Sequence, residues 1–324
     1  MLSIVICHRD KALLWAIKKS IEETVGILYE LIVIDNTENI YTILSAYNEG
    51  VKKARYDYIC FTHEDILFYT KNWGQKVVNH FTDPETGMIG VEGGLAQSSI
   101  PSAWWYNNYF AKSARNMLIR EKRSKKLFLY TSNPFNEQRT EAIIIDGLWF
   151  CIRKSLFSKI SFDEKTFTGF HLYDADISMQ VLEHAKNFIV YDILLEHHWS
   201  ENISKDYYLE LVKFTDKWRN NLPIQNKKIA DNYMDIYNWH ALRYYILEMK
   251  TKDFTKKDIK DFFKTYYPVA KKRHKSFWFN AYFSLSKYIG LANANRIFYR
   301  LEKISGFCKI PDYTKKEFKQ HVTA

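Results

Sequence analysis

The stretch that decides the fold runs from Tyr56 to Phe68 and reads Tyr-Asp-Tyr-Ile-Cys-Phe-Thr-His-Glu-Asp-Ile-Leu-Phe. Residues 58–61 have the β-branched and aromatic content of a buried strand, and His63-Glu64-Asp65 follows it. In open α/β sheets, ligands bind at the carboxyl ends of the strands. Carboxylate and imidazole groups side by side at such an end can hold a divalent cation, and through it a diphosphate. The stretch favours an enzyme, although an acidic cluster after a strand is also an ordinary solvated loop.

The residues before this stretch alternate between strand and helix patterns. Apolar runs at 2–7 and 30–34 predict two strands, and the stretch at 56–61 predicts a third. Residues 11–23 and 40–54 carry apolar side chains at helical spacing. Strand and helix in strict alternation are typical of a parallel sheet with right-handed crossovers. We therefore expect an α/β protein.

The elements after Phe68 are expected to complete this sheet. Helices are predicted at 73–81 and 177–183, and strands at 88–91, 150–152 and 188–195. Residues 97–140 read as one long irregular loop with aromatic residues at 104–109 and a basic cluster at 115–126, and long loops of this kind are usually functional or disordered. Beyond about residue 205 strand patterns stop. We expect an α/β domain over 1–220 and a helical region over 221–324.

The composition limits the classes of protein to consider. The chain has 324 residues, of which 47% are hydrophobic and 26% charged, as in globular rather than disordered proteins. The aromatic share of 17% suits stacking on sugars or bases, and equally a packed core. The net charge of +10 suits anionic partners such as nucleotide diphosphates, nucleic acid or an anionic membrane surface.

Cysteine usage and the first residues bear on the compartment. Cys7, Cys60, Cys151 and Cys308 are scattered, so we expect neither a disulfide framework nor structural zinc, and a reducing compartment. The apolar start reads as a first strand rather than a signal peptide, and no apolar stretch reaches the roughly 20 residues that span a bilayer. We expect a cytoplasmic protein.

Three clusters of acidic and imidazole residues follow predicted strands or begin a predicted helix. They are His63-Glu64-Asp65, Asp174-Ala175-Asp176 and Glu196-His197-His198. We expect all three at one edge of the sheet, where they would form a candidate site in which one set of residues holds a metal and another carboxylate takes a proton. Each also has a structural interpretation: Asp174 and Asp176 suit a helix N-terminus, and the histidines suit a half-buried strand end. No Gly-x-Gly-x-x-Gly, Walker or Gly-x-Ser-x-Gly sequence is present, which argues against dinucleotide enzymes, P-loop NTPases and serine hydrolases.

The order of these motifs resembles the family 2 inverting glycosyltransferases of GT-A fold, particularly bacterial members that build surface polysaccharide. The resemblance covers roughly residues 1–220. The matching segments are Ser3–Ile6, Glu30–Asn36, Ala46–Gly50, Ala54, Tyr58–Asp65, Asp146-Gly147, Phe162-Asp163 and Tyr173–Asp176. It implies a GT-A-like, mostly parallel mixed sheet flanked by helices, with a C-terminal helical extension.

The resemblance implies a nucleotide-sugar donor, with a UDP-sugar favoured, bound against the first three strands. The donor-binding residues it implies are Cys7, His8, Arg9, Asp35, Asn48, His63, Glu64 and Asp65. His63-Glu64-Asp65 occupies the place of the family's Asp-x-Asp signature, so Mn²⁺ or Mg²⁺ is expected on Asp65, with His63 in place of the usual first Asp. A further ligand is expected from His197 or His198, and the two remain alternatives.

The resemblance also places Asp174 at the position of the general base, which would deprotonate an acceptor hydroxyl of a glycan or lipid-linked acceptor. Residues expected on the acceptor side are Trp104, Trp105, Asp146, Gly147, Tyr173 and Asp176. Two rivals remain: a sugar nucleotidyltransferase, and a non-catalytic sugar- or lipid-binding protein on a degenerate GT-A scaffold. A nucleotidyltransferase is expected to carry a Gly-rich basic loop after the first strand. This chain has Cys7-His8-Arg9-Asp10 there, which does not match that loop.

The C-terminal third carries the basic run Lys271–Lys275 directly before the aromatic segment Phe277–Phe283. A basic cluster beside an aromatic helix is typical of a membrane-surface segment, and it is also compatible with a small helical domain that has a solvated basic face. No motif for nucleic-acid binding is present, so we expect no nucleic-acid partner. Peripheral attachment to the inner face of the cell membrane and a homo-oligomer are both compatible with the sequence.

Overall fold

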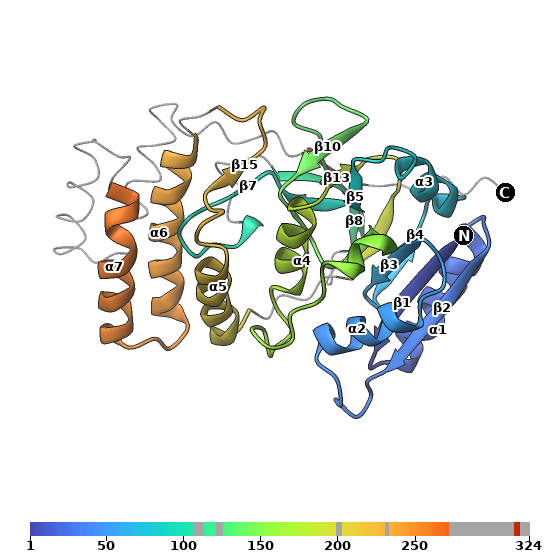
Figure 1. The fold of residues 1–324 in the computed structure, drawn as a ribbon, viewed down its shortest axis with the longest axis horizontal. Coiled ribbons are helices and arrows are strands. Elements are labelled where there is room, and N and C mark those ends of the chain that lie inside the picture. Colours follow the sequence, from blue (N-terminus) through green and yellow to red (C-terminus); the bar gives the residue numbers. More distant parts are fainter. Residues whose placement is uncertain (106–112, 121–125, 199–202, 231–232, 272–313, 318–324) are drawn as a thin grey trace. The chain divides into compact units, whose positions relative to one another are not determined.

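The computed structural model describes residues 1–105, 113–120, 126–198, 203–230, 233–271 and 314–317 (Figure 1). The chain forms two compact units. The first comprises residues 1–95, 113–202 and 312–324, and the second comprises residues 96–112 and 203–311. The expected boundary at residue 220 falls inside the second unit, which begins its longer segment before α5 (Lys205–Lys217).

The larger sheet of the first unit has the strand order β10-β13-β5-β12-β3-β1-β2. Its strands are β1 (Leu2–His8), β2 (Tyr29–Asp35), β3 (Tyr58–Thr62), β5 (Thr86–Gly90), β10 (Arg139–Ala142), β12 (Trp149–Arg153) and β13 (Lys186–Val190). β1 pairs in parallel with β2 and β3, and β13 pairs in parallel with β5. β12 runs antiparallel to β3 and β5, and β10 runs antiparallel to β13. All strands except β10 and β12 therefore point the same way, which confirms the predicted mixed, mostly parallel sheet.

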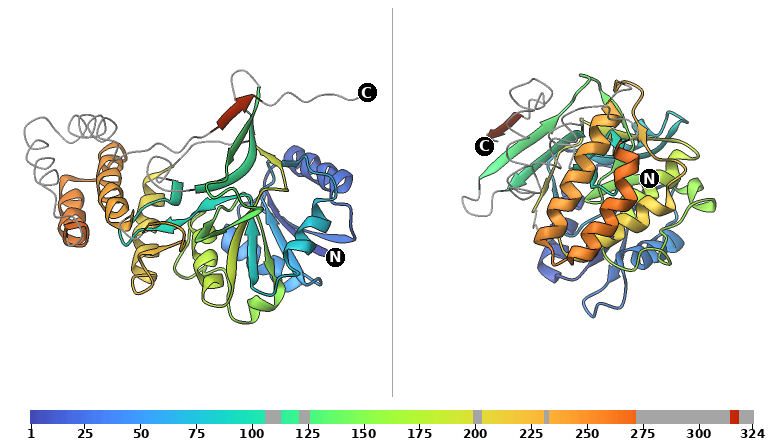
Figure 2. Two further views of the ribbon diagram at one scale, coloured as in Figure 1. Left: turned by 90° about the horizontal axis from the view of Figure 1, so that it is seen from above. Right: turned by 90° about the vertical axis from the view of Figure 1, so that its left-hand side faces the viewer.

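Helices cover both faces of this sheet (Figure 2). They are α1 (Lys11–Thr24), α2 (Ile43–Lys53), α3 (Trp73–His80), α4 (Tyr173–Leu182) and a 3₁₀ turn at Lys154–Ser158. Successive side chains of a strand face opposite sides of the sheet. In β1, Ile4 belongs to the same hydrophobic cluster as Ile17 of α1, whereas Val5 faces α2. A Cβ on Gly50 would lie 2.4 Å from Val5 Cγ1, so glycine lets α2 lie close against β1.

A second sheet in the same unit has the order β11-β6-β8-β14-β4, with β9 on β8 and β16 on β9. Its strands are β4 (Ile66–Phe68), β6 (Glu92–Gly94), β8 (Ser113–Arg120), β9 (Leu127–Ser132), β11 (Ile144–Ile145), β14 (Leu195–His197) and β16 (Thr314–Glu317). The expectation of an irregular segment over 97–140 is therefore wrong for β8 and β9. The predicted strand at 188–195 is correct only at its two ends, because the chain leaves the larger sheet after Val190 and enters the second sheet at Leu195.

Cys60 and Cys151 form a disulfide, although the scattered cysteines indicated no disulfide framework. They are directly opposed on the antiparallel strands β3 and β12, and both are fully buried. Their Cα atoms are 4.0 Å apart. The sequence separation of 91 residues hides this pairing, since it depends on β12 returning beside β3. Cys7, at the end of β1, is a free thiol.

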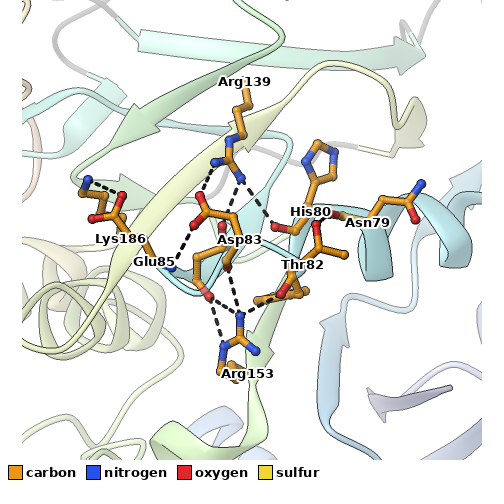
Figure 3. A network of polar contacts seen from close by, with 10 residues as sticks. Asn79, His80, Thr82, Asp83, Glu85, Arg139, Arg153 and Lys186 are labelled. Carbon is orange, nitrogen blue, oxygen red and sulfur yellow. Dashed lines mark hydrogen bonds and ion pairs between the residues drawn. The ribbon is translucent and has the colours of Figure 1, made fainter.

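Two arginines fix the loop that leads from α3 into β5 (Figure 3). Arg139 donates to the Asp83 carboxylate and, at 3.0 Å, to Thr86 Oγ1. Arg153 donates to the carbonyl oxygens of Phe81 at 2.9 Å and Asp83 at 3.2 Å. Because Thr86 begins β5, this network lies at the amino end of β5. It is a structural anchor at the end of the strand away from the predicted ligand-binding edge.

The second unit contains the short pair β7 (Ala96–Gln97) and β15 (Ile224–Gln225), and the helices α5, α6 (Tyr233–Thr251) and α7 (Lys256–Lys271). Ser98 Oγ donates to Asn238 Oδ1 at 2.6 Å, which ties the segment after β7 to α6. The basic run and the aromatic segment that follows it lie outside the described residues, except for Lys271. Among the residues that are described, no helix has the length and hydropathy needed to cross a bilayer.

Candidate active site

His63, Asp65 and His197 converge at the carboxyl end of β3. The His63 N–H donates to the Leu148 carbonyl at 3.0 Å, which keeps the chain extended beyond the strand. β14 pairs with β4 so that His197 lies opposite Ile66, next to Asp65. As a result one ligand atom from each of the three side chains lies within 4.8 Å of the others.

The chemistry of these three side chains fits a divalent cation. Asp65 Oδ2 lies 3.5 Å from His197 Nε2, whereas Asp65 Oδ1 is buried without a hydrogen bond from any described residue. A buried carboxylate oxygen in that state carries a desolvation cost that a bound cation would offset. Two imidazoles and one carboxylate are a donor set used by ions such as Mn²⁺ and Zn²⁺.

Burial and charge prepare these groups for binding. Burial, together with the neighbouring His197, lowers the pKa of His63 to about 4, so its imidazole is neutral at pH 7. Burial alone would raise the pKa of Asp65, but the hydrogen bond and charge of His197 outweigh it and the pKa falls below its usual value. Burial alone would lower the pKa of His197, but the hydrogen bond and charge of Asp65 outweigh it and the pKa is raised.

Of the two candidate histidines, His197 places its side chain beside the Asp65 carboxylate, whereas the side chain of His198 contacts Glu196. His198 Nε2 lies 2.7 Å from Glu196 Oε1. Glu196 is fully buried; it accepts hydrogen bonds from Arg120 Nε at 2.5 Å and Nη2 at 2.8 Å, and from the Tyr69 hydroxyl at 2.7 Å. The predicted cluster at 196–198 is thus divided between the candidate metal site and a separate ion-pair network.

Glu64 faces the β1–α1 loop rather than its two neighbours. Its Oε2 accepts hydrogen bonds from the backbone N–H groups of Arg9 and Asp10, both at 3.0 Å. The Asp10 carboxylate in turn caps α1 by accepting from Ala12 N at 2.7 Å and Leu13 N at 3.1 Å. Glu64 therefore ties the end of β3 to the start of α1.

A cavity of about 220 Å³ opens beside the cluster, between the ends of β1, β2 and β3. Its lining residues are Cys7, Arg9, Leu13, Asn36, Ile43, His63, Glu64, Asp65 and Phe170. Five of these, Cys7, Arg9, His63, Glu64 and Asp65, belong to the predicted donor-binding set. Sequence reasoning missed Phe170, whose ring is 49% exposed and lies 5.9 Å, centroid to centroid, from His63. An aromatic residue directly after Gly169, in the loop that leads into α4, is the signal that could have indicated it.

The other three predicted donor residues make structural contacts within the fold. The exposed Asp35 accepts hydrogen bonds from Thr37 N at 3.0 Å and Thr37 Oγ1 at 2.8 Å. His8 is buried, with Nε2 3.8 Å from Asp35 Oδ1. Asn48, on α2, bonds both backbone groups of Phe162, at 2.8 and 3.1 Å.

Asp174 lies in the first turn of α4, and both its oxygens meet backbone N–H groups. Oδ2 accepts from Gly147 N at 2.9 Å and Oδ1 from Ala175 N at 2.8 Å. Burial nevertheless raises its pKa to about 6, against these two hydrogen bonds. The pKa of Asp146 is raised further, because burial and the negative charges of Glu92 and Asp174 all disfavour its ionised form. At neutral pH Asp174 is the better proton acceptor of this carboxyl pair.

The remaining predicted acceptor residues divide between the two units. Tyr173 is buried and its hydroxyl lies 2.7 Å from His63 Nε2. Asp176 is also buried and accepts from Gln180 Nε2 at 2.7 Å. Trp104 and Trp105 belong to the second unit, where Trp105 stacks on Tyr207 with ring centroids 5.3 Å apart. An acceptor role for these residues stays a prediction.

Comparison with known proteins gives matches to solved structures and to one family. No curated protein matches the sequence. The chain is similar to A197 from STIV, at 12% identity and a TM-score of 0.35, over 61% of this chain and 86% of that one. It is also similar to GalNAc-T7, solved with UDP, GalNAc and Mn²⁺, at 12% identity and a TM-score of 0.46, over 90% of this chain but only 58% of that one. The model of a glycosyltransferase-like family matches residues 3–221, more than half of the chain. The chain therefore belongs to this glycosyltransferase-like family.

Proposed function

We propose that this protein is a metal-dependent inverting glycosyltransferase that moves a sugar from a nucleotide-diphosphate donor to a hydroxyl of a glycan or lipid-linked acceptor. One observation carries the proposal. In a chain of this family, a His-Asp-His cluster and the half-buried carboxylate of Asp174 lie at the same edge of the sheet, and Gly147 and Tyr173 connect them. A metal ligand set and a proton acceptor are the two components that such a transfer requires.

The donor is proposed to bind in the cavity beside β1, β2 and β3. His63, Asp65 and His197 would hold Mn²⁺ or Mg²⁺, and a bound cation there would offset the charge that develops on the leaving diphosphate. Arg9 lines the same cavity and offers a second positive charge to the phosphates. The exposed ring of Phe170 offers a face on which a base or sugar can stack. A UDP-sugar is the donor favoured by the family resemblance.

Asp174 is proposed to take the proton. As a carboxylate it accepts the hydrogen of the acceptor hydroxyl while that oxygen attacks the anomeric carbon. The bond from the anomeric carbon to the diphosphate oxygen breaks, and the nucleoside diphosphate leaves from the opposite face. This single displacement inverts the anomeric configuration. The N–H groups of Gly147 and Ala175 hold the carboxylate in place during the transfer.

The acceptor and the cellular location are part of the same proposal. The net charge of +10 suits a protein that works beside anionic lipid or polysaccharide. We place it in the cytoplasm, peripheral to the inner face of the membrane, in the assembly of surface polysaccharide. Sedimentation of the full chain with vesicles that contain phosphatidylglycerol, compared with neutral vesicles, tests this location. No preference for the anionic vesicles would contradict it.

The first experiment is calorimetric titration of the full chain with UDP, GDP, dTDP and CDP, each with and without Mn²⁺. Binding of one nucleotide that requires Mn²⁺ supports the proposal and identifies the donor class. Asp65→Ala should then weaken the metal-dependent binding, because the carboxylate is one of three ligands. Absence of nucleotide binding in every condition would contradict the donor site and favour the rival binding protein.

A transfer assay follows with the matching nucleotide sugar. Proton NMR of the product should show the anomeric configuration opposite to that of the donor. Retention of configuration would exclude the single displacement and with it the proposed role of Asp174.

A further inference from the structure

The hydroxyl of Tyr173 lies between an imidazole nitrogen and a carbonyl oxygen. It is 2.7 Å from His63 Nε2, and it donates to the Gly147 carbonyl at 3.1 Å. A phenol has one proton, and a carbonyl oxygen can only accept a hydrogen bond. With the Tyr173 proton directed at the Gly147 carbonyl, the hydrogen in the other contact has to be supplied by His63 Nε2. This arrangement requires a neutral imidazole with its proton on Nε2 and a lone pair on Nδ1.

The surroundings of His63 agree with this assignment. The imidazole lines the cavity together with Asp65, and Nδ1 makes no hydrogen bond with any residue that the structure describes. We propose that Tyr173 is a positioning residue that holds His63 in the Nε2–H tautomer, so that Nδ1 is the atom that binds the divalent cation. This inference rests on the proposed metal site and names the ligating atom and its support. Such partners commonly fix the orientation and tautomer of metal-binding histidines.

Gly147 connects the metal side of the site to the base. A Cβ on Gly147 would lie 2.0 Å from the Tyr173 hydroxyl oxygen, so only glycine leaves room for the phenol there. The carbonyl of Gly147 orients Tyr173, and its N–H donates to Asp174 Oδ2 at 2.9 Å. One glycine residue therefore positions both the partner of His63 and the carboxylate. In this inference Tyr173 and Gly147 act through His63 and Asp174 rather than by touching an acceptor.

The tautomer can be measured without any metal. Long-range ¹H–¹⁵N spectra of the full chain with labelled histidine, recorded with chelator at pH 7.5, distinguish a protonated from an unprotonated ring nitrogen. His63 is assigned by the signal that disappears in His63→Gln. We expect Nε2–H in the native protein and a mixture of tautomers in Tyr173→Phe. An Nδ1–H tautomer in the native protein, or an unchanged tautomer in Tyr173→Phe, would overturn the proposal.

Tyr47→Phe is the matched control for Tyr173→Phe. Tyr47 is fully buried and packs edge-on against Tyr173, with ring centroids 5.6 Å apart. Its hydroxyl has no hydrogen-bond partner among the described residues, so the substitution removes a neighbouring hydroxyl without touching His63. By Mn²⁺ calorimetry we expect Tyr173→Phe to weaken binding about 10- to 100-fold and Tyr47→Phe to change it little. Equal effects of the two substitutions would reduce Tyr173 to a packing role and overturn the inference.

Two substitutions of His63 identify the ligating atom itself. The amide oxygen of Asn can occupy the place of Nδ1, whereas that of Gln reaches the place of Nε2. We expect His63→Asn to retain more Mn²⁺ affinity than His63→Gln, and the opposite order would overturn the assignment. These readouts are separate from catalysis. A protein with the expected tautomer and Mn²⁺ affinity but no sugar transfer would contradict the proposed function alone, whereas an active enzyme with the wrong tautomer would contradict only this inference.

Discussion

The Asp174 carboxylate accepts a hydrogen bond from the backbone N–H of Gly147, at 2.9 Å. These residues come from different elements, the first turn of α4 and the loop between β11 and β12. Because the second oxygen meets Ala175 N, the carboxylate is held by two donors and cannot rotate freely. A side chain held in this way and with a pKa near 6 can accept a proton at neutral pH without first reorienting.

Replacing Asp174 with Asn should abolish most of the transfer while leaving donor binding nearly intact. The amide has no proton-accepting carboxylate, and loss of a general base typically costs about 10²- to 10⁴-fold in rate. Steady-state transfer and nucleotide calorimetry on the same preparation check this. As a control, Asp163→Asn changes a carboxylate that caps a surface turn through Thr166 N. Near-native transfer by Asp174→Asn would assign the base elsewhere.

The acid limb of the pH–rate profile should reflect the ionisation of Asp174. Because burial raises its pKa to about 6, the basic form predominates above pH 6 and is lost below it. We expect kcat/KM to fall about tenfold for each pH unit below that value. Initial rates from pH 4.5 to 8 at saturating metal test this. A profile that is flat down to pH 5 would be inconsistent with a carboxylate of raised pKa as the base.

Asp146→Asn should stabilise the protein, and more so as the pH rises. Burial and the charges of Glu92 and Asp174 raise the pKa of Asp146 in the folded state, so the folded state binds more protons than the unfolded state between about pH 4 and that raised value. The free energy of unfolding of the native protein therefore falls as pH rises through this window. Asn keeps the acceptor for Leu148 N without a charge. We expect Tm to rise by at least about 2–4 °C at pH 8, equivalent to ~1 kcal/mol.

Melting curves with chelator at pH 5 and pH 8 measure this effect, with the exposed Asp57→Asn as control. An equal shift at both pH values would mean that the charge of Asp146 is not responsible.

Particular residues show how far the sequence could predict this structure. The first three strands and the cluster at 63–65 follow from contiguous apolar runs and from the polar residues directly after them. β8 was missed because the polar residues Arg115 and Asn116 occupy buried positions on its two opposite faces, and such residues are typical of loops. Arg115 is accommodated by an ion pair with Glu92 at 3.2 Å, which the sequence does not indicate. The contact of Tyr173 with His63 joins residues 110 positions apart. No local pattern predicts such a contact, since it depends on where α4 packs.

Glu196→Gln should destabilise the first unit. Glu196 is fully buried and accepts two hydrogen bonds from Arg120, so the substitution removes the negative charge from this buried ion pair. Breaking a buried ion pair typically costs about 3–5 kcal/mol. We expect the lower end of that range, because the Arg120 side chain is 35% exposed and water can solvate it in part. Chemical denaturation measures the change, with the exposed Glu38→Gln as control, and a loss below ~1 kcal/mol would show that the pair is dispensable.

His63→Asp should change the metal preference of the site. Carboxylate oxygen is a harder ligand than imidazole nitrogen, so the substitution favours Mn²⁺ and Mg²⁺ relative to Zn²⁺. We expect the ratio of Zn²⁺ to Mn²⁺ affinity to fall by about tenfold, equivalent to ~1.4 kcal/mol. Competition titrations measure it, and His184→Asp, an exposed position near the end of α4, is the control. An unchanged ratio would mean that His63 is not a ligand.

The position of Glu64 has a consequence for how a phosphate can be bound. In many nucleotide-binding folds, the free N–H groups at the start of the first helix are the phosphate cradle. Here Glu64 accepts from Arg9 and Asp10, and Asp10 accepts from Ala12 and Leu13, so the chain has placed its own carboxylates where a ligand's anion would otherwise sit. These N–H groups already donate to Glu64 and Asp10 of the same chain. The positive charge that the proposed diphosphate requires would therefore have to come from outside the start of α1, and the cation proposed to bind His63, Asp65 and His197 would supply it.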